Sequence, residues 1–317
     1  MTHSRRGRYK LRAVPHLSGG GRLEARGRGA APTPRAVLIA ALVVRAGTAH
    51  ALEVPQYLGP RPPKQVRRVV TLAPSITEIV LALGARDRLV GVSRFDALPE
   101  VSALPRVGGF VDPSIEAVLA LKPDLLLVQP SPGNQRPVEK MAELGMPVLA
   151  LPMHTVAQTL ASIREVGRAL DLSARAEQLV RRIESTRARI RSQASSRNPP
   201  RVLVVYEWEP LVVAGRGSFA DELVRDAGGR NVADKAQTPY PVYSVEAAAA
   251  ARPEVIIDVA HDPQAAERFR TMPGLAGARW VRLPTDDLMH PGPNLGRGLE
   301  ELYRILHPEA ADGGMAR

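Results

Sequence analysis

Ser114-Ile-Glu-Ala-Val-Leu-Ala-Leu-Lys-Pro-Asp-Leu-Leu-Leu-Val128 predicts one short helix followed at once by a buried strand. Ser114 can cap the start of the helix by accepting a hydrogen bond from a free backbone N–H. Glu116 lies in the first turn, where the helix dipole favours a carboxylate. Pro123 ends the helix. The apolar run Leu125–Val128 is typical of a strand that is covered on both faces.

The same pattern returns about 130 residues later as Ser244-Val-Glu-Ala-Ala-Ala-Ala-Ala-Arg-Pro-Glu-Val-Ile-Ile257. The serine, the first glutamate and the proline match in register, and a basic residue precedes the proline in both copies. A period of this length is not that of a solenoid. It predicts two similar halves, each with a helix-then-strand unit and a carboxylate at the tip of its helix.

Positive charge is concentrated at the N-terminus. The 317-residue chain carries a formal net charge of +11, and residues 1–51 supply +9 of it through ten Lys/Arg and one Glu. The remainder is close to neutral, at +2, so we expect no nucleic-acid binding, which requires a basic face. The chain is long enough for two domains of ordinary size.

Residues 1–51 resemble an export leader. Arg35 precedes the apolar run 36–44, and Ala49-His50-Ala51 is a small-x-small cleavage pattern. The basic part before the run is unusually long, which an over-extended start would explain. The alternative is a basic tail before an internal helix. The cysteine count is zero, which removes thiolate chemistry and a lipid-anchor cysteine. We therefore expect a periplasmic protein without a membrane anchor.

Strands and helices alternate on both sides of one long predicted helix. The alternation predicts parallel α/β sheets in an N-terminal lobe, 66–170, and a C-terminal lobe, 198–308. The segment 171–197 contains a helix of about 22 residues that begins near Ser173, roughly 33 Å long at 1.5 Å per residue. Residues 52–65 form a Pro-rich lead-in and 309–317 a loose tail.

From about Val66 to Pro308 the chain resembles the periplasmic substrate-binding proteins of the cobalamin and iron-siderophore class. The resemblance is carried by Val70-Thr-Leu-Ala-Pro-Ser-x-Thr-Glu78, Glu116…Leu121-Lys-Pro-Asp124, Ala214-Gly-x-Gly-Ser218, Gly228-Gly-x-Asn231 and Pro239-Tyr-Pro-x-x-Ser-x-Glu246. It implies a class III periplasmic binding protein, with two Rossmann-like lobes joined by one long rigid helix and a ligand held between the lobes. It also implies a monomer that is not an enzyme and that delivers its ligand to an ABC permease of the inner membrane.

The resemblance assigns permease docking to Glu116 and Glu246, because one carboxylate on each lobe of such proteins meets arginines of the permease. Exposed carboxylates of this kind steer association and fix its register more than they add affinity. The alternative is that each glutamate only complements the dipole of its own helix.

Four aromatic residues are candidate ligand contacts: Phe95, Phe110, Trp208 and Tyr240. All four fall in predicted loops beyond strand ends, where open α/β sheets bind ligands. The chain has only 12 aromatic residues, so this concentration favours stacking on a flat macrocycle. The resemblance places stacking aromatics at Phe110 and Tyr240. Ordinary packing in the core or in a loop is the alternative for each of them.

His290 and Asn294 precede the last predicted helix, at positions where the resembled proteins often carry arginines that bind polar ligand groups. This departure leaves the ligand open. Cobalamin or a related corrinoid is the first expectation, and haem or a ferric siderophore is the alternative. His290 can hydrogen-bond a corrinoid amide or coordinate a metal centre, or it is a solvated loop histidine.

Two weaker hypotheses remain. A bare metal-ion receptor would use His154, His261 and His290 with Asp286 and Asp287, but the sequence lacks the short His spacings typical of metal sites. A hydrolase would use Ser75, which follows a strand and opens a helix but lacks the G-x-S-x-G elbow. We expect neither a resident metal nor a catalytic cofactor.

Overall fold

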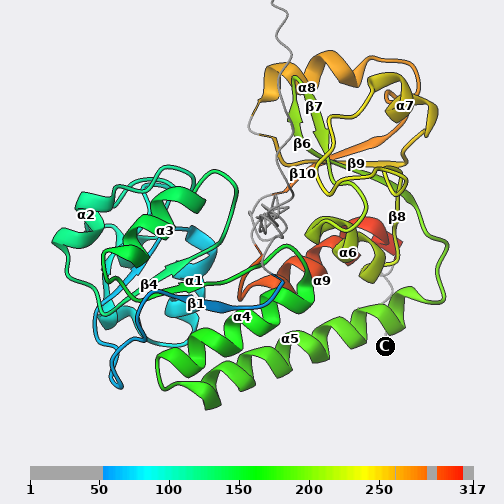
Figure 1. The fold of residues 1–317 in the computed structure, drawn as a ribbon. Helices are drawn as coiled ribbons and strands as arrows, with labels where there is room; N and C mark the ends of the chain where they lie inside the picture. The colour runs from blue at the N-terminus through cyan, green and yellow to red at the C-terminus, as the bar shows by residue number, and fades with distance from the viewer. Residues whose placement is uncertain (1–52, 261, 284–290, 310–317) are drawn as a thin grey trace, which may run out of the picture. The chain divides into compact units, whose positions relative to one another are not determined.

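The computed structural model describes residues 53–260, 262–283 and 291–309, and Figure 1 traces them as a mixed α/β fold. The predicted leader therefore lies outside the described residues, together with His261, Asp286, Asp287 and His290. We call the first sheet and its helices the N-terminal lobe and the second sheet and its helices the C-terminal lobe. The lobe boundaries inferred from the sequence remain predictions.

The sheet of the N-terminal lobe has the strand order β1-β5-β4-β2-β3. Its strands are β1 (Gln56–Leu58), β2 (Val69–Thr71), β3 (Leu89–Gly91), β4 (Leu125–Val128) and β5 (Val148–Ala150). Neighbouring strands are parallel except β1, which pairs with β5 in the antiparallel sense. Strand β1 lies inside the Pro-rich lead-in, where the sequence pattern indicated none. All four residues of β4 are buried, as predicted for a strand covered on both faces.

Four helices surround this sheet: α1 (Pro74–Ala82), α2 (Ile115–Ala120), α3 (Gln135–Glu143) and α4 (Val156–Ala169). Two 3-10 turns at Arg86–Arg88 and Pro99–Val101 flank β3. The predicted cap of α2 is confirmed, because the Ser114 hydroxyl accepts a hydrogen bond from the backbone N–H of Ala117 at 3.2 Å.

The sheet of the C-terminal lobe runs β10-β9-β6-β7, and β8 also pairs with β6. Its strands are β6 (Arg201–Trp208), β7 (Leu211–Val213), β8 (Arg230–Asn231), β9 (Val255–Asp258) and β10 (Arg279–Arg282). Only β7 is antiparallel to its neighbour. The accompanying helices are α6 (Phe219–Asp226), α7 (Val245–Ala250), α8 (Pro263–Arg270) and α9 (Leu295–Leu306).

Helix α5 (Ser173–Ala194) connects the two lobes and has the predicted length of 22 residues. Its N-cap residue is Leu172, so Ser173 is the first helical residue and makes no capping hydrogen bond. The helix packs against α4 at one end and against α6 and α9 at the other, as Figure 1 shows. Its buried stripe includes Leu179, Ile183 and Ile190, the positions that the 3.6-residue period indicates.

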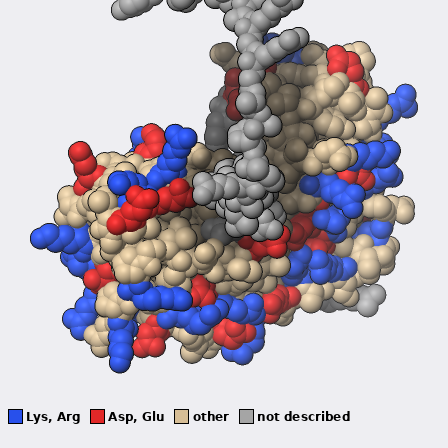
Figure 2. Space-filling view, in the orientation of Figure 1, with Lys and Arg blue, Asp and Glu red and all other residues tan. Residues whose placement is uncertain are grey.

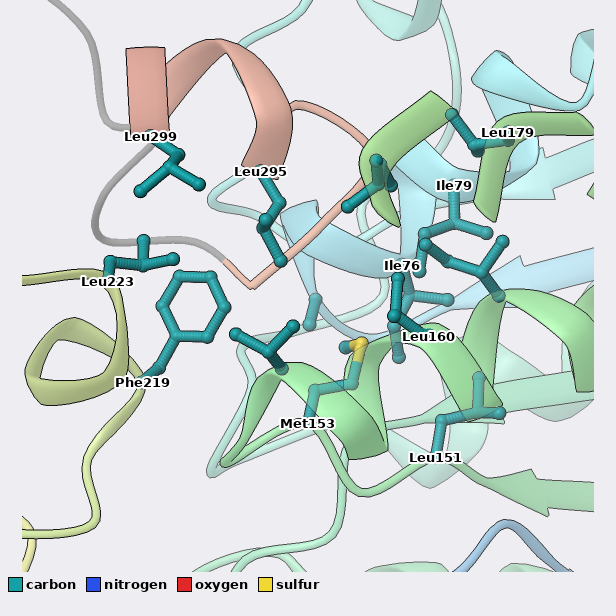
Figure 3. Close-up of a cluster of buried hydrophobic side chains, with 14 of the residues drawn as sticks. Ile76, Ile79, Leu151, Met153, Leu160, Leu179, Phe219, Leu223, Leu295 and Leu299 are labelled. Atoms are coloured by element: carbon teal, nitrogen blue, oxygen red, sulfur yellow. The ribbon is translucent and has the colours of Figure 1, made fainter. Parts of the chain in front are cut away.

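One buried apolar cluster contains residues from both lobes. In Figure 3, Phe219 and Leu295 of the C-terminal lobe lie on one side of this cluster, and Met153, Ile76 and Leu160 of the N-terminal lobe lie on the other. Each sheet also covers a second cluster with its opposite face. Shared burial of this kind couples the stability of the two lobes.

The sequence repeat is also a structural repeat. Helices α2 and α7 are each followed, after one capping residue, by a basic residue in the left-handed conformation, Lys122 and Arg252, each with φ of 45°. An arginine at the start of a parallel strand in each lobe reaches back to this turn: Arg68 directly precedes β2, and Arg201 is the first residue of β6. Arg68 Nε donates to the carbonyl of Lys122 at 3.1 Å, and Arg201 Nε donates to that of Arg252 at 2.8 Å.

In each copy of the repeated unit, an acidic residue after the proline also binds the backbone at the start of the neighbouring strand. The carboxylate of Asp124 accepts from the backbone N–H of Arg68 at 2.9 Å, and that of Glu254 accepts from the N–H of Arg201 at 2.8 Å. The acid and the arginine therefore fix the C-terminal end of each short helix to the neighbouring strand. This orients the opposite end, which carries the glutamate.

Among the described residues no helix is long and apolar enough to cross a bilayer. On the face drawn in Figure 2, basic and acidic side chains are interspersed rather than segregated. This arrangement agrees with the near-neutral charge of the sequence beyond residue 51.

Candidate functional site

Phe95 lies in the loop after β3 and presents an exposed aromatic ring. Its exposed fraction is 57 %, and the Arg94 guanidinium lies 5.3 Å from the ring centroid. Arg94 also pairs with Asp112, whose pKa is lowered by the hydrogen bond and charge of that guanidinium. A Cβ on Gly109 would lie 3.0 Å from the Phe95 ring, so the backbone of the next loop approaches the ring closely. The Phe95 loop is thus braced by the loop before α2.

Phe110 belongs to that second loop and is half-buried against the main core. Its carbonyl accepts a hydrogen bond from Asn134 Nδ2 at 2.9 Å, and the same amide donates to Gln129 at 2.9 Å. Asn134 is 1 % exposed, so the anchor is shielded from water. The sequence analysis missed this residue, because a buried asparagine at the start of α3 has no distinguishing pattern. The adjacent Val111 is 51 % exposed.

Tyr240 is the exposed aromatic residue of the C-terminal lobe. Its exposed fraction is 46 %, and its ring forms an edge-to-face pair with that of Tyr206, with centroids 5.2 Å apart and an interplanar angle of 85°. Burial raises the pKa of both phenols. Val242, two residues further on, is 70 % exposed and pairs through its backbone with Val212 of β7. Tyr206 was not among the predicted site residues.

Exposed apolar side chains are concentrated in two regions, one around Phe95 in the N-terminal lobe and one around Tyr240 in the C-terminal lobe. Of the six large apolar side chains that are exposed among the described residues, four are Phe95, Val111, Tyr240 and Val242. Covering such surface is favourable by roughly 25 cal/mol per Å², so grouped exposed apolar residues indicate a ligand or a partner. Each group lies on loops that follow strands of its own sheet.

The prediction that Trp208 lies in a loop beyond a strand end is wrong. The residue ends β6 instead of lying in a loop, and its side chain is 1 % exposed. Trp208 Nε1 donates to Asp258 at 3.0 Å, and the indole stacks on Trp280 with centroids 5.2 Å apart. Phe269 of α8 lies against the same indole, with centroids 4.8 Å apart. Trp208 is a core residue of the C-terminal lobe and is not available to a ligand.

A cavity of about 240 Å³ opens beside this aromatic group. Its lining includes Asp258, Glu267, Arg270, Trp280 and Arg282. The charged groups are already paired, Arg282 with Asp258 at 3.0 Å and Arg270 with Glu267 at 3.7 Å. All four charged side chains of this lining therefore have partners within the lobe.

Glu116 and Glu246 are both exposed in the first turns of α2 and α7. Ser114 and Ser244 cap these helices with identical N–H···O distances of 3.2 Å. The Ser244 hydroxyl also donates to the Glu246 carboxylate at 2.6 Å, and this bond lowers the pKa of Glu246. Both side chains are thus presented to solvent in the first turns of their helices.

Asn294 lies at the start of α9 and makes a contact between the lobes. Its Nδ2 donates to the Glu78 carboxylate of α1 at 3.4 Å. His154, in the loop between β5 and α4, is half-buried, and burial lowers its pKa, which favours the neutral imidazole. His261 and His290 lie outside the described residues. Among the residues that the structure describes, no three metal-ligating side chains come together.

Two α/β sheets with mainly parallel strands, connected by α5, define a class III periplasmic binding protein. The family model described as periplasmic binding protein matches residues 69–282, and the chain belongs to this family. Members of the family are substrate-binding proteins.

Three relatives show what the chain resembles in detail. The vitamin B12-binding protein of Yersinia pestis (strain Pestoides F) is 28% identical over 197 residues, which cover 62% of this chain and 70% of the relative. A periplasmic vitamin B12 binding protein of Vibrio cholerae is 25% identical, with a TM-score of 0.67 over 78% of this chain and 98% of that one. A periplasmic heme-binding protein of Roseiflexus sp. RS-1 is 28% identical, with a TM-score of 0.68 over 77% and 99%.

Proposed function

We propose that this protein is the periplasmic substrate-binding component of an ABC importer and that it captures cobalamin or a related corrinoid between its lobes. The observation that carries the proposal is the exposure of Phe95 and Tyr240 on loops beyond the strands of the two sheets. The vitamin B12-binding relatives in Yersinia and Vibrio support it. In this proposal 66–170 and 198–308 are the lobes and 171–197 is the link.

Phe95 and Tyr240 supply flat apolar surface that a macrocycle would cover. Phe110 and Asn294 join them at the edge of the site, and Trp208 does not, because it is buried. No covalent step is required. Stacking and a few polar contacts hold the ligand, and the protein needs no catalytic cofactor.

Haem is the second candidate. The heme-binding protein of Roseiflexus is as similar in sequence, at 28%, as the vitamin B12-binding protein of Yersinia, and the match covers more of this chain. A ferric siderophore is the remaining alternative within the same class of ligand.

Calorimetric titration of the purified protein with cyanocobalamin, hemin and ferrichrome tests these candidates. Our proposal expects cyanocobalamin to bind at least 100-fold more tightly than the other two. Tight binding of hemin alone would replace the first candidate with the second. Failure of all three to bind would remove the proposed function.

Phe95→Ala and Tyr240→Ala test the location of the site. Each should weaken binding of the preferred ligand by about 1–3 kcal/mol, the scale for losing a buried aromatic contact. Leu144→Ala is a matched control, because Leu144 is also exposed, at 54 %, but lies at the end of α3 away from both loops. Equal effects at all three positions would argue against the site.

We further propose that Glu116 and Glu246 dock against basic residues of an inner-membrane permease. Glu116→Gln with Glu246→Gln should leave ligand affinity unchanged and slow ligand uptake by cells that depend on the importer. Glu139→Gln with Glu143→Gln, a pair on α3, controls for loss of two surface charges. Uptake at the wild-type rate in the first double variant would refute the docking role.

A further inference from the structure

An exposed valine precedes each of the two exposed glutamates in the chain. Val111 lies five residues before Glu116 and is 51 % exposed, and Val242 lies four residues before Glu246 and is 70 % exposed. A chain spans at most about 3.6 Å per residue, so the Cα atoms of each pair lie within roughly 18 Å of each other. Each lobe therefore presents a carboxylate and an exposed aliphatic side chain in one small region of its surface.

Val111 is held in place by its own loop and by a second loop. The two sides of its loop are joined by a backbone bridge between Gly108 and Pro113. A Cβ on Gly133 would lie 3.1 Å from the Val111 side chain, so the backbone of the loop before α3 supports part of the valine. The remaining part of the side chain meets solvent from a fixed position.

Val242 is held at the edge of the C-terminal sheet. Its backbone bridges to β7, which is the edge strand. Both of its neighbours are bonded to the same strand: the carbonyl of Pro241 accepts from the N–H of Val213 at 3.3 Å, and the N–H of Tyr243 donates to the carbonyl of Leu211 at 2.8 Å. The backbone on both sides of Val242 is thus tied to the sheet, while its side chain is free.

A carboxylate and a rigid aliphatic side chain contribute differently to a protein interface. Charges steer association and fix its register more than they add affinity. Apolar area removed from water supplies affinity, and a side chain that is already fixed binds without a large cost of ordering. The rings of Phe95 and Tyr240 offer flat faces to a flat ligand. A branched valine offers a convex group that fits a depression in a protein surface.

We infer that Val111 and Val242 are apolar contacts of the surface that docks to the permease, one beside each docking glutamate. The partner surface has the complementary chemistry, with a basic residue next to a shallow apolar depression for each lobe. This inference rests on the proposed function, because it extends the docking role of Glu116 and Glu246. It assigns the exposed aromatic rings to the ligand and the exposed valines to the permease.

Uptake by spheroplasts that lack their own copy of the protein tests this surface. Purified protein loaded with cyanocobalamin, or with hemin if hemin is the ligand that binds, is added at increasing concentration. Val111→Ala and Val242→Ala should each raise the concentration for half-maximal uptake about tenfold, the scale for two methyl groups lost from a buried contact. Val54→Ala is the matched control, because Val54 is 66 % exposed and lies before β1. It should leave that concentration unchanged, and a tenfold rise there too would overturn the inference.

Ionic strength separates the valines from the glutamates. Salt screens exposed charges, with a Debye length of about 10 Å at 0.1 M, and has no such effect on an apolar contact. The tenfold effect of each valine variant should persist between 0.1 and 0.5 M NaCl, whereas the effect of Glu116→Gln with Glu246→Gln should shrink. A valine effect that shrinks in the same way would overturn the inference, because the valine would then act only through the neighbouring charge.

Calorimetric titration of the same variants with the ligand separates docking from ligand binding. Val111→Ala and Val242→Ala should bind the ligand with wild-type affinity. Weaker ligand binding would assign the valines to the ligand site and overturn the inference, while the proposed function would stand. Wild-type uptake in both valine variants, together with slow uptake in the double glutamate variant, would overturn the inference alone. Wild-type uptake in all of these variants would remove the docking role of the glutamates as well.

Discussion

At the scale of single residues, Trp208 and Tyr240 are aromatic residues of one lobe with opposite surroundings. Trp208 is 1 % exposed and has a hydrogen-bond partner for its only polar atom, whereas Tyr240 is 46 % exposed. A large buried ring contributes mainly to the stability of the fold, and an exposed one is available to a ligand. The two residues should therefore affect different measurements.

Trp208→Ala should lower the free energy of unfolding by about 3–5 kcal/mol, because it leaves a cavity against Trp280 and removes the donor to the buried Asp258 carboxylate. Urea denaturation followed by circular dichroism measures this loss. The folded fraction should bind ligand with wild-type affinity. Weakened binding by protein that remains fully folded would instead place Trp208 at the ligand.

His154 should make stability depend on pH. Burial lowers the pKa of the folded imidazole below its ordinary value of 6.5, so the unfolded chain binds a proton more readily. The contribution of His154 is complete above pH 6.5 and is lost as the pH falls through the window between that value and the lower folded pKa. Urea midpoints at pH 7.5 and 5.0 should therefore differ more in the wild type than in His154→Gln. An equal difference in both proteins would contradict this assignment.

At the scale of secondary-structure elements, the repeated unit was predictable and its attachment was not. Ser114, Ser244 and the prolines indicate both short helices, and the structure confirms their serine caps. The bonds from Arg68 and Arg201 to the ends of those helices span more than 50 residues, and no local pattern specifies contacts at such separation. Strand β1 was missed for the same reason, because it forms only by pairing with β5.

The strand end at Trp208 shows a different kind of failure. Glu207 and Glu209 flank the tryptophan, and charged neighbours beside a proline favoured a loop. The same Glu-Trp-Glu triplet also has the two-residue alternation of a strand with one buried face. That alternation was the pattern that could have predicted a strand at Trp208. The buried residue that binds the indole N–H, Asp258, lies 50 residues away in the sequence.

The left-handed turns after α2 and α7 should be improved by glycine. Lys122 and Arg252 have φ of 45°, a conformation that costs a residue with a Cβ about 1–2 kcal/mol. Lys122→Gly and Arg252→Gly should each raise the free energy of unfolding by ~0.5–1 kcal/mol after the extra chain entropy of glycine is subtracted. Arg181→Gly, inside α5, should instead lower it by about 1 kcal/mol. Urea denaturation of the three variants measures these changes. A lower free energy of unfolding in Lys122→Gly and Arg252→Gly would contradict the expectation.

At the scale of the whole molecule, the helix between the lobes could be predicted from periodicity, but the cluster that the lobes share could not. The pattern of α5 gives its length and its buried stripe. It does not indicate that Phe219 and Leu295 join Met153 and Ile76 in one core, because these residues meet only after both lobes have folded. The same limit applies to the contact of Asn294 with Glu78.

A shared core implies that the lobes unfold together. Phe219 is 1 % exposed within the cluster that both lobes build, so Phe219→Ala should cost about 3–5 kcal/mol. Amide hydrogen exchange should then accelerate by a similar factor in β4 and in β9, although Phe219 belongs to neither strand. Leu211→Ala is the control, since Leu211 is also buried, with an exposed fraction of 4 %, but packs in the cluster confined to the C-terminal lobe. If Phe219→Ala accelerates exchange in β9 and leaves β4 at the wild-type rate, the two lobes are independent folding units and the shared cluster does not couple them.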